Sequence, residues 1–424
     1  MKLLINICAH DGIISHNAGV GTMVKRYIEV FCKNLKLKEI NFHLNLITPE
    51  YNVGGFGYSE LTKMENESNP NISIYCVPNG TNGKKFFGNL DNWKELSYNT
   101  AKIINSINFE TYDCVITLLN DTPFAGVLEL AKDDKKHLKI WIPHSTAKIH
   151  LPNIADINTQ KRIEWEYFYI NYVNLHENAY VAAIGKYIKE HLINCYYLRK
   201  EKCLWLPNGE ILSSKTIYEE NDECAKLFEN VKKYDEIILS YGRPEEYKNL
   251  DSSMRVSRLL GIKTVVVTQE YYNGMEYVDY LKKLALETDS DLYINAPFNF
   301  PQYILNHYEK KIIMLIPSKK EIAGLLVNEI RKMNKNNILL VANDIDGIKE
   351  QIDDGVDGVL VDLNNLKKAA IKIKRYYNKE CMKKLNQKSQ ETLHTKYDFE
   401  RTCDDFLENV LNNIEVVKHG RIWI

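Results

Sequence analysis

The sequence predicts an α/β protein built from two Rossmann-like domains, and three observations lead to this fold class. Short, mostly apolar runs typical of strands alternate with segments of helical length whose apolar residues recur every three or four positions. This alternation occurs twice along the 424 residues, and a polar stretch at 213–224 separates the two occurrences. Apolar strands separated by helices are typical of parallel sheets that helices cover on both faces.

The first half contains predicted strands at 3–8, 42–48, 113–119, 138–143, 180–185 and 203–207. The second half contains predicted strands at 236–242, 263–269, 291–296, 312–317 and 338–343. The predicted helices include 21–36, 160–176, 222–233, 276–288 and 319–333. We expect an N-terminal domain at 1–210 and a C-terminal domain at 211–395, with the junction near 208–235. A long polar loop is expected at 51–73.

Composition excludes several classes of protein. Hydrophobic residues make up 45% and charged residues 26%, as in an ordinary globular chain, and the formal net charge is −1. This charge does not indicate a nucleic-acid partner. The apolar runs are too short for a transmembrane helix, and the first residues are typical of a strand rather than a signal peptide. Nine cysteines without C-x-x-C spacing indicate reduced thiols, no metal site and a cytoplasmic protein.

One segment departs from this even charge. Residues 366–388 carry nine lysines or arginines against one glutamate, on segments with helical spacing. A solvated basic face is the ordinary interpretation of such a segment. Peripheral attraction to an anionic membrane surface is the alternative.

The loops that follow strands hold the candidate site, because ligands of open α/β sheets bind beyond the carboxyl ends of the strands. After the first strand, Gly19 and Gly21 open a helix, where glycines let a backbone approach an anion closely. Taken alone, such a pair of glycines more often marks an ordinary turn. After 236–242 come Arg243 and Lys248, which together would neutralise a diphosphate. Ordinary surface charges explain this pair equally well.

A third loop carries two carboxylates around a glycine. Glu321 and Glu329 lie about two helical turns apart, and Gly324 falls between them near an expected helix start. The carboxylates would bind hydroxyl groups, while the backbone N–H groups of Gly324, Leu325 and Leu326 would bind phosphate. Taken alone, this spacing is common by chance.

Taken together, these elements resemble the family-4-like retaining glycosyltransferases of the glycosyltransferase-B type. Six elements stand in the family's order: the AGVGT turn with Gly19 and Gly21, the strand end at His144, the turn Pro207-Asn208-Gly209, the element of Gly242, Arg243 and Lys248, the segment from Pro317 to Glu329, and the segment from Gly347 to Val361. The chain departs from the family's usual residues at Ala323, Ile330 and 343–346, so the donor sugar is not inferred from the resemblance.

The resemblance implies two Rossmann-like domains that face each other across a cleft, with a last helix in 396–424 returning to the first domain. It implies transfer of a sugar from a nucleotide-diphosphate sugar to a hydroxyl acceptor, with retention of configuration and with no metal or cofactor. Arg243 and Lys248 would stabilise the leaving diphosphate, Glu321 would bind the sugar and Glu329 the ribose. His144 would contact the sugar from the first domain. His10 and His16 flank the first loop and are candidates for contact with the acceptor.

Two other functions remain open at this point. The same fold serves sugar-nucleotide epimerases and phosphorylases, although the paired glutamates with Arg243 and Lys248 favour transfer. A catalytically inactive scaffold that binds glycan or a partner transferase is the alternative from a different class. Such a scaffold would have no need of a complete diphosphate-binding set.

Overall fold

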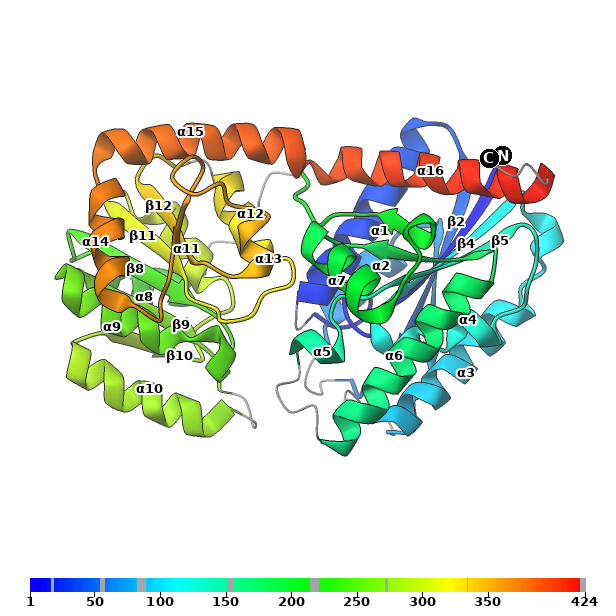
Figure 1. Ribbon diagram of the computed structural model, residues 1–424, viewed down its shortest axis with the longest axis horizontal. Helices are drawn as coiled ribbons and strands as arrows, with labels where there is room; N and C mark the ends of the chain where they lie inside the picture. The colour runs from blue at the N-terminus through cyan, green and yellow to red at the C-terminus, as the bar shows by residue number, and fades with distance from the viewer. Residues whose placement is uncertain are drawn as a thin grey trace. The chain divides into compact units, whose positions relative to one another are not determined.

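The computed structural model describes residues 1–16, 19–53, 58–81, 89–150, 156–213, 221–270, 274–333 and 335–419. The chain forms two compact units, Met1–Ile211 together with Phe399–Ile424, and Leu212–Asp398. Each unit is a parallel sheet with helices packed on both faces (Figure 1). The predicted fold class of two Rossmann-like α/β domains is confirmed.

The first unit contains a seven-stranded sheet in the order β3-β2-β1-β4-β5-β6-β7 within the described residues. Its strands are β1 (Lys2–Cys8), β2 (Asn41–Pro49), β3 (Ile72–Val77), β4 (Cys114–Asn120), β5 (His137–Ile142), β6 (Ala179–Ala183) and β7 (Cys203–Trp205). Its helices are α1 (Gly19–Leu37), α2 (Glu60–Glu67), α3 (Leu90–Ser106), α4 (Val127–Leu130), α5 (Ala147–His150), α6 (Ile157–Leu175), α7 (Lys186–Tyr196) and α16 (Phe399–His419).

The last helix of the chain, α16, packs against α1 of the first unit. The ring of Phe399 is fully buried, 5.4 Å from the ring of Tyr27. Asn34 Nδ2 donates a hydrogen bond to Asp404 Oδ1 at 2.8 Å, and Lys33 forms an ion pair with Glu400. These contacts fix the start of α16 against α1.

The second unit contains a six-stranded sheet in the order β10-β9-β8-β11-β12-β13 within the described residues. Its strands are β8 (Glu236–Tyr241), β9 (Lys263–Thr268), β10 (Asp291–Ile294), β11 (Lys311–Ile316), β12 (Ile338–Asn343) and β13 (Val359–Val361). Its helices are α8 (Asp222–Val231), α9 (Leu250–Leu260), α10 (Met275–Thr288), α11 (Phe300–His307), α12 (Leu325–Met333), α13 (Asp346–Lys349), α14 (Leu366–Tyr376) and α15 (Lys379–Lys396).

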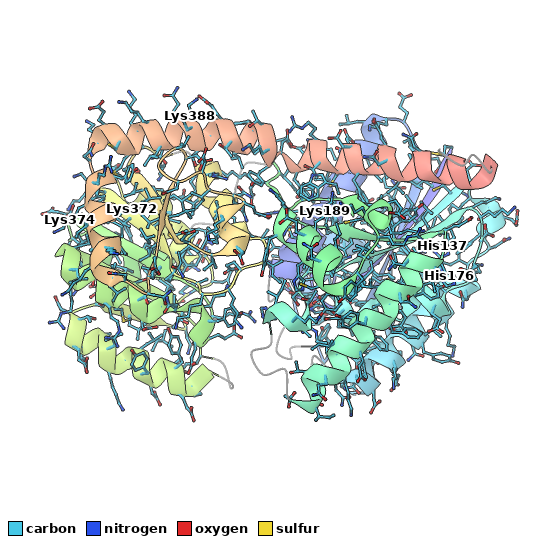
Figure 2. All side chains as sticks on the ribbon, in the orientation of Figure 1. His137, His176, Lys189, Lys372, Lys374 and Lys388 are labelled. Atoms are coloured by element: carbon cyan, nitrogen blue, oxygen red, sulfur yellow. The ribbon has the colours of Figure 1, made fainter. Side chains whose placement is uncertain are left out.

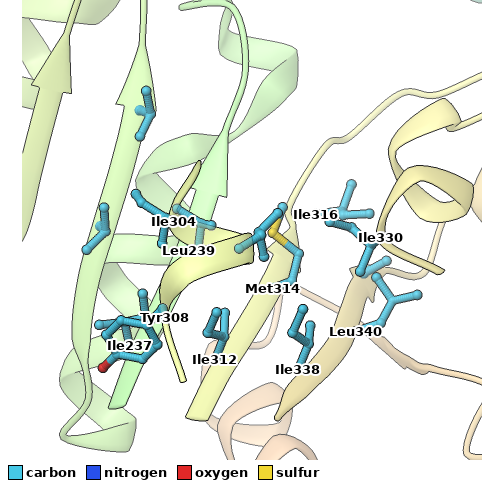
Figure 3. Close-up of a cluster of buried hydrophobic side chains, with 14 of the residues drawn as sticks. Ile237, Leu239, Ile304, Tyr308, Ile312, Met314, Ile316, Ile330, Ile338 and Leu340 are labelled. Carbon is cyan, nitrogen blue, oxygen red and sulfur yellow. The ribbon is translucent and has the colours of Figure 1, made fainter. Parts of the chain in front are cut away.

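Burial on both faces explains why the strands of the second sheet read as continuous apolar runs. Ile237, Ile312 and Ile338 occupy neighbouring positions on β8, β11 and β12, and all three are at most 2% exposed. They pack with Ile304 on α11 and with Tyr308, which directly follows α11, in one apolar layer (Figure 3). This layer holds β8 and β11 side by side, which positions the loops that follow them.

Three sequence expectations need correction. The predicted polar loop at 51–73 is wrong in part, because α2 and the edge strand β3 lie within or beside it; residues 54–57 lie outside the described structure. The strand β13 was not among the predicted strands. The helix expected at 319–333 begins only at Leu325, because the preceding residues form a loop.

None of the helices in the described ranges is long and apolar enough to cross a membrane. The basic segment 366–388 forms α14 and the first turns of α15, and Lys374 and Lys388 lie on their outer surface (Figure 2).

A row of hydrogen-bonded polar side chains crosses the otherwise apolar first sheet. Asn45 Nδ2 donates to Asn6 Oδ1 at 3.0 Å, and Asn6 Nδ2 donates to Thr117 Oγ1 at 3.0 Å. His137 Nδ1 lies 3.1 Å from Lys132 O, and His137 Nε2 lies 2.8 Å from Thr117 Oγ1. Because a carbonyl only accepts, Nδ1 carries the proton of the neutral ring, and Nε2 accepts from the Thr117 hydroxyl. The buried network is satisfied only while His137 is neutral.

This arrangement predicts acid sensitivity of the first unit. Burial lowers the pKa of His137 (Figure 2) from 6.5 to about 4, so between these values the unfolded chain takes up a proton that the folded chain does not. Stability contributed by neutral His137 is therefore complete above pH 6.5 and is lost as the pH falls toward 4, by about 2 kcal/mol at pH 5. Urea unfolding at pH 7.5 and pH 5 checks this.

Tryptophan fluorescence confines the unfolding signal to the first unit. All five tryptophans fall within residues 1–211 and 399–424: Trp93, Trp141, Trp165, Trp205 and Trp423. The variant His137→Asn should be less stable at neutral pH but lose less stability on acidification. An identical pH dependence in this variant and the wild type would show that His137 is not the responsible group.

Candidate active site

The candidate site of the second unit lies where the strand order reverses. The chain leaves β8 toward β9 on one side and leaves β11 toward β12 on the other, although β8 and β11 are neighbours. The loops at 242–249 and 317–324 therefore diverge at the carboxyl ends of these two central strands. Such a switch point is where open α/β sheets bind ligands.

Lys248 and Glu321 meet at this switch point. Lys248 Nζ lies 2.6 Å from Glu321 Oε1, and Ser318 Oγ donates to the same oxygen at 2.9 Å. Both charged side chains remain 21% exposed, so the pair is sheltered but open to a ligand. The structure thus brings together two predicted residues that lie 73 positions apart in the chain.

The backbone explains how Lys248 reaches this position. Lys248 ends a short 3-10 turn, Glu246–Lys248, and is followed by Asn249 in the left-handed region at φ 57°. Asn249 Nδ2 donates to Pro317 O at 2.9 Å, and Lys319 N donates to Tyr247 O at 2.7 Å. Asparagine tolerates this conformation better than most residues, and its amide ties the two loops together.

Arg243 lies on the same loop and is anchored at its guanidinium. Arg243 Nη2 donates to Tyr247 Oη at 2.8 Å and lies 3.2 Å from Glu245 Oε2. Burial raises the pKa of Tyr247, an effect that the nearby Arg243 charge opposes. The side chain of Arg243 is 41% exposed, which leaves its fork accessible to an anion.

The third predicted element differs from expectation in where its helix starts. Leu325 is the first residue of α12, so Glu321 belongs to the preceding loop, whereas Glu329 lies in the second turn of the helix and is partly exposed. The N–H group of Gly324 is within 2.7 Å of the side-chain amide of Gln351. A phosphate at this helix start would therefore meet the N–H groups of Leu325 and Leu326, which have no intrahelical partner.

In the first unit, His144 follows the central strand β5, as predicted. Its Nε2 lies 3.2 Å from Asn120 Oδ1. Burial lowers the pKa of His144 to about 4; the nearby Asp121 carboxylate opposes this shift and His10 adds to it. His144 is therefore neutral near pH 7 and can contribute hydrogen bonds rather than charge.

Gly19 and Gly21 open α1, as expected, but their surroundings include an acid that the sequence analysis missed. A Cβ atom on Gly21 would lie 2.5 Å from Asp11 Oδ2. The Asp11 carboxylate is buried and accepts hydrogen bonds from Gly12 N at 3.1 Å and Ser15 Oγ at 2.9 Å. Close packing on Asp11 therefore requires a glycine at position 21, whether or not an anion binds beside it. His16 Nε2 lies 3.4 Å from Thr22 Oγ1 in the same region.

Asp121, directly after β4, is a second residue that sequence reasoning missed. It adopts φ 71° although it is not glycine, and Trp141 Nε1 donates to its carbonyl at 3.2 Å. Its side chain is 3% exposed, and Oδ1 has no hydrogen-bond partner among the described residues. Strained backbone of this kind persists only where the surrounding structure fixes it. Its position at a strand end was the available signal.

Two α/β units, each built on a parallel sheet, are the architecture of the glycosyltransferase-B fold. Residues 225–393 match the profile of the family described as "Glycosyl transferases group 1". The resemblance inferred from the six motifs is confirmed. No curated protein matches the chain by sequence.

Solved structures share the fold across the whole chain. Sucrose-phosphate synthase from Thermosynechococcus elongatus superposes with a TM-score of 0.72 at 14% identity, covering 97% of this chain and 99% of its own. A glycosyltransferase from Rickettsia africae gives 0.68 at 18% identity, with 98% and 99% covered. Anabaena HepE, solved with UDP and glucose, gives 0.67 at 14% identity, with 96% and 99% covered.

Proposed function

We propose that this glycosyltransferase moves a sugar from a nucleotide-diphosphate sugar to a hydroxyl acceptor, with retention of anomeric configuration and without a divalent metal. The observation that carries the proposal is the Lys248–Glu321 pair with Ser318 at the switch point of the second sheet. The match of residues 225–393 to the profile of "Glycosyl transferases group 1" supports the reaction class.

Charge development during transfer explains why this set suits the reaction. Breaking the bond from sugar to phosphate leaves negative charge on the diphosphate and positive charge at the anomeric carbon. Fixed donors that face the leaving group lower the barrier without having to reorganise. Lys248, Arg243 and the N–H groups at the start of α12 would supply these donors, and Glu321 would bind hydroxyl groups of the sugar.

The remaining predicted residues complete the proposal. Glu329, two turns into the segment that begins near Glu321, would bind the ribose hydroxyls. Neutral His144 would hydrogen-bond the sugar or the acceptor, and the N–H groups at Gly19 and Gly21 would assist the phosphates. A cytoplasmic location suits a supply of nucleotide sugars.

The first donors to test follow from the structural relatives. Anabaena HepE was solved with UDP-glucose, so UDP-glucose heads a series that includes GDP-glucose and ADP-glucose. A donor that binds should raise the unfolding temperature, by mass action on the folded state. Release of nucleoside diphosphate, measured with and without acceptor extracts, then distinguishes transfer from binding. Binding without any release would favour the inactive scaffold.

Retention and metal independence need separate measurements. The anomeric configuration of the first-formed product, read by NMR before mutarotation, should equal that of the donor. Turnover should also be unchanged by EDTA. An inverted product, or activity that disappears with EDTA and returns with Mg²⁺, would contradict these parts of the proposal.

We also propose that the basic face of α14 and the start of α15 contacts an anionic membrane. Nine cations and one acid give residues 366–388 a charge of +8, so a total of −1 leaves −9 on the rest of the chain. On α14 the buried Ala369, Ala370 and Ile373 face the core, whereas Ile371 is 71% exposed within a set of exposed cations. An apolar residue among cations is the arrangement that suits a lipid surface.

The double variant Lys374→Glu/Arg375→Glu should bind vesicles of anionic phosphatidylglycerol at least about tenfold more weakly, since each surface cation contributes about 1 kcal/mol and reversal adds repulsion. Flotation of the full chain with these vesicles measures this. The matched control, Lys226→Glu/Lys233→Glu, changes the charge equally at exposed positions on α8 and directly after it. Equal binding by both double variants, or equal binding to neutral phosphatidylcholine vesicles, would contradict the membrane contact.

A further inference from the structure

The loop that carries Glu321 rests directly on the backbone of α13. A Cβ atom on Gly347 would lie 1.9 Å from Glu321 O and 2.5 Å from Glu321 C. Only a residue without a side chain permits so close an approach. The backbone of Glu321 is therefore placed by the segment that follows β12, and not by α12 alone.

Gln351, two residues after the end of α13, reaches the other end of the same loop. Its side-chain amide faces both polar backbone groups of Gly324. In the amide orientation that satisfies both groups, the oxygen accepts from Gly324 N at 2.7 Å and the nitrogen donates to Gly324 O at 3.1 Å. Gln351 is 5% exposed, so water does not compete for these bonds. A planar amide is suited to this task because it offers one acceptor and one donor side by side.

The backbone of Gln351 is fixed independently of its side chain. Arg331, near the end of α12, donates from Nη2 to Gln351 O at 2.6 Å and lies 2.9 Å from Asp357 Oδ2. The guanidinium is fully buried, and Asp357 also accepts from Asp353 N at 2.8 Å and Thr392 Oγ1 at 2.7 Å. A buried charge pair with satisfied hydrogen bonds holds one geometry, since either partner alone would be costly.

We propose that Gln351 is a positioning residue for donor binding, an inference that rests on the proposed function. Gly324 directly precedes Leu325 and Leu326 and follows Glu321 by three residues. By fixing both polar groups of Gly324, Gln351 sets the direction of the next two N–H groups and the distance from Glu321 to the start of α12. It acts on the donor through this backbone and does not touch the donor.

Three variants test the role. Gln351→Leu removes both bonds to Gly324 at similar size. Gln351→Glu keeps the shape but loses the donor until the carboxyl group is protonated. The matched control is Ser389→Ala, which removes a buried hydroxyl 3.2 Å from Arg331 Nε in the same network without touching Gly324.

The measurements are amide hydrogen exchange of the free chain and steady-state kinetics with whichever of UDP-, GDP- and ADP-glucose the wild type turns over. Gln351→Leu should exchange faster in 318–327 and lose at least about tenfold in kcat/KM for the donor, because small misplacements of binding groups cost up to about 10²-fold. Ser389→Ala should change neither by more than about twofold. Relative to wild type, Gln351→Glu should regain activity as the pH falls from 8 to 6, when a buried carboxyl group takes up a proton.

These measurements distinguish failure of the positioning role from failure of the proposed function. Unchanged exchange in Gln351→Leu, or an equal loss of kcat/KM in Gln351→Leu and Ser389→Ala, would overturn the positioning role while leaving the transferase proposal intact. A flat ratio of Gln351→Glu to wild type across this pH range would do the same. If the wild type releases no nucleoside diphosphate from any donor, the proposed function fails first, and the positioning role fails with it.

Discussion

Lys248→Ala is expected to slow donor turnover roughly 30- to 1000-fold, corresponding to the 2–4 kcal/mol that one fixed donor to a developing charge contributes. The ammonium lies at the switch point, 2.6 Å from Glu321, where it would meet the leaving diphosphate. Its removal also leaves the half-buried Glu321 carboxylate without its cation. Release of nucleoside diphosphate under saturating donor measures the effect.

The matched control is Lys319→Ala, an exposed cation one residue after Ser318 on the facing loop. It removes the same charge but no contact to Glu321, so turnover should stay within about twofold of wild type. Arg243→Ala should resemble Lys248→Ala, because its guanidinium is the second cation on the loop. Near-normal turnover in both Arg243→Ala and Lys248→Ala, with the fold intact, would favour the scaffold function.

Strand positions were predictable because each strand is a local pattern. The eleven strands expected from apolar runs match strands of the structure, since burial on both faces leaves a continuous apolar signature. β3 was missed because this edge strand is mostly only partly buried and directly follows the polar stretch 65–71. These patterns are readable without knowledge of which strands pair.

The start of α12 shows what a local pattern does not contain. Residues 319–324 have helical spacing, yet they form a loop because distant groups hold them: Asn249 bonds Pro317 O, Asn343 bonds Ser318 O, and Gln351 bonds Gly324. Tertiary contacts override intrinsic helical preference. The same dependence on distant contacts explains why Gln351 and Asp11 were absent from the predicted site.

The Lys248–Glu321 pair could be predicted from the sequence only in part. Spacing alone gave each residue a weak signal, and only the family's order of motifs placed them in one site. The structure supplies the physical link, since both loops leave neighbouring strands at the switch point. Sequence order therefore placed both residues in one predicted site, whereas the contact between them required the fold.

Glu321→Gln and Glu329→Gln are expected to impair the enzyme in different ways. Glu321 accepts from Lys248 Nζ at 2.6 Å and Ser318 Oγ at 2.9 Å beside the proposed sugar position. Interactions that strengthen as the sugar gains positive charge act on the transition state, so Glu321→Gln should lower kcat roughly 10²-fold. The isosteric amide preserves shape, so folding should change little.

Glu329 lies in the second turn of α12, farther along the segment, where a nucleoside ribose would lie if phosphate meets the N–H groups of Leu325 and Leu326. A contact made equally in the ground and transition states contributes to binding alone, so Glu329→Gln should raise donor KM several-fold with kcat nearly unchanged. Glu229→Gln, an exposed change on α8, is the control for lost charge. Steady-state kinetics in the donor distinguishes the two variants. If both change only donor KM, or if neither changes the kinetics, the assignment of this loop and helix to the donor is wrong.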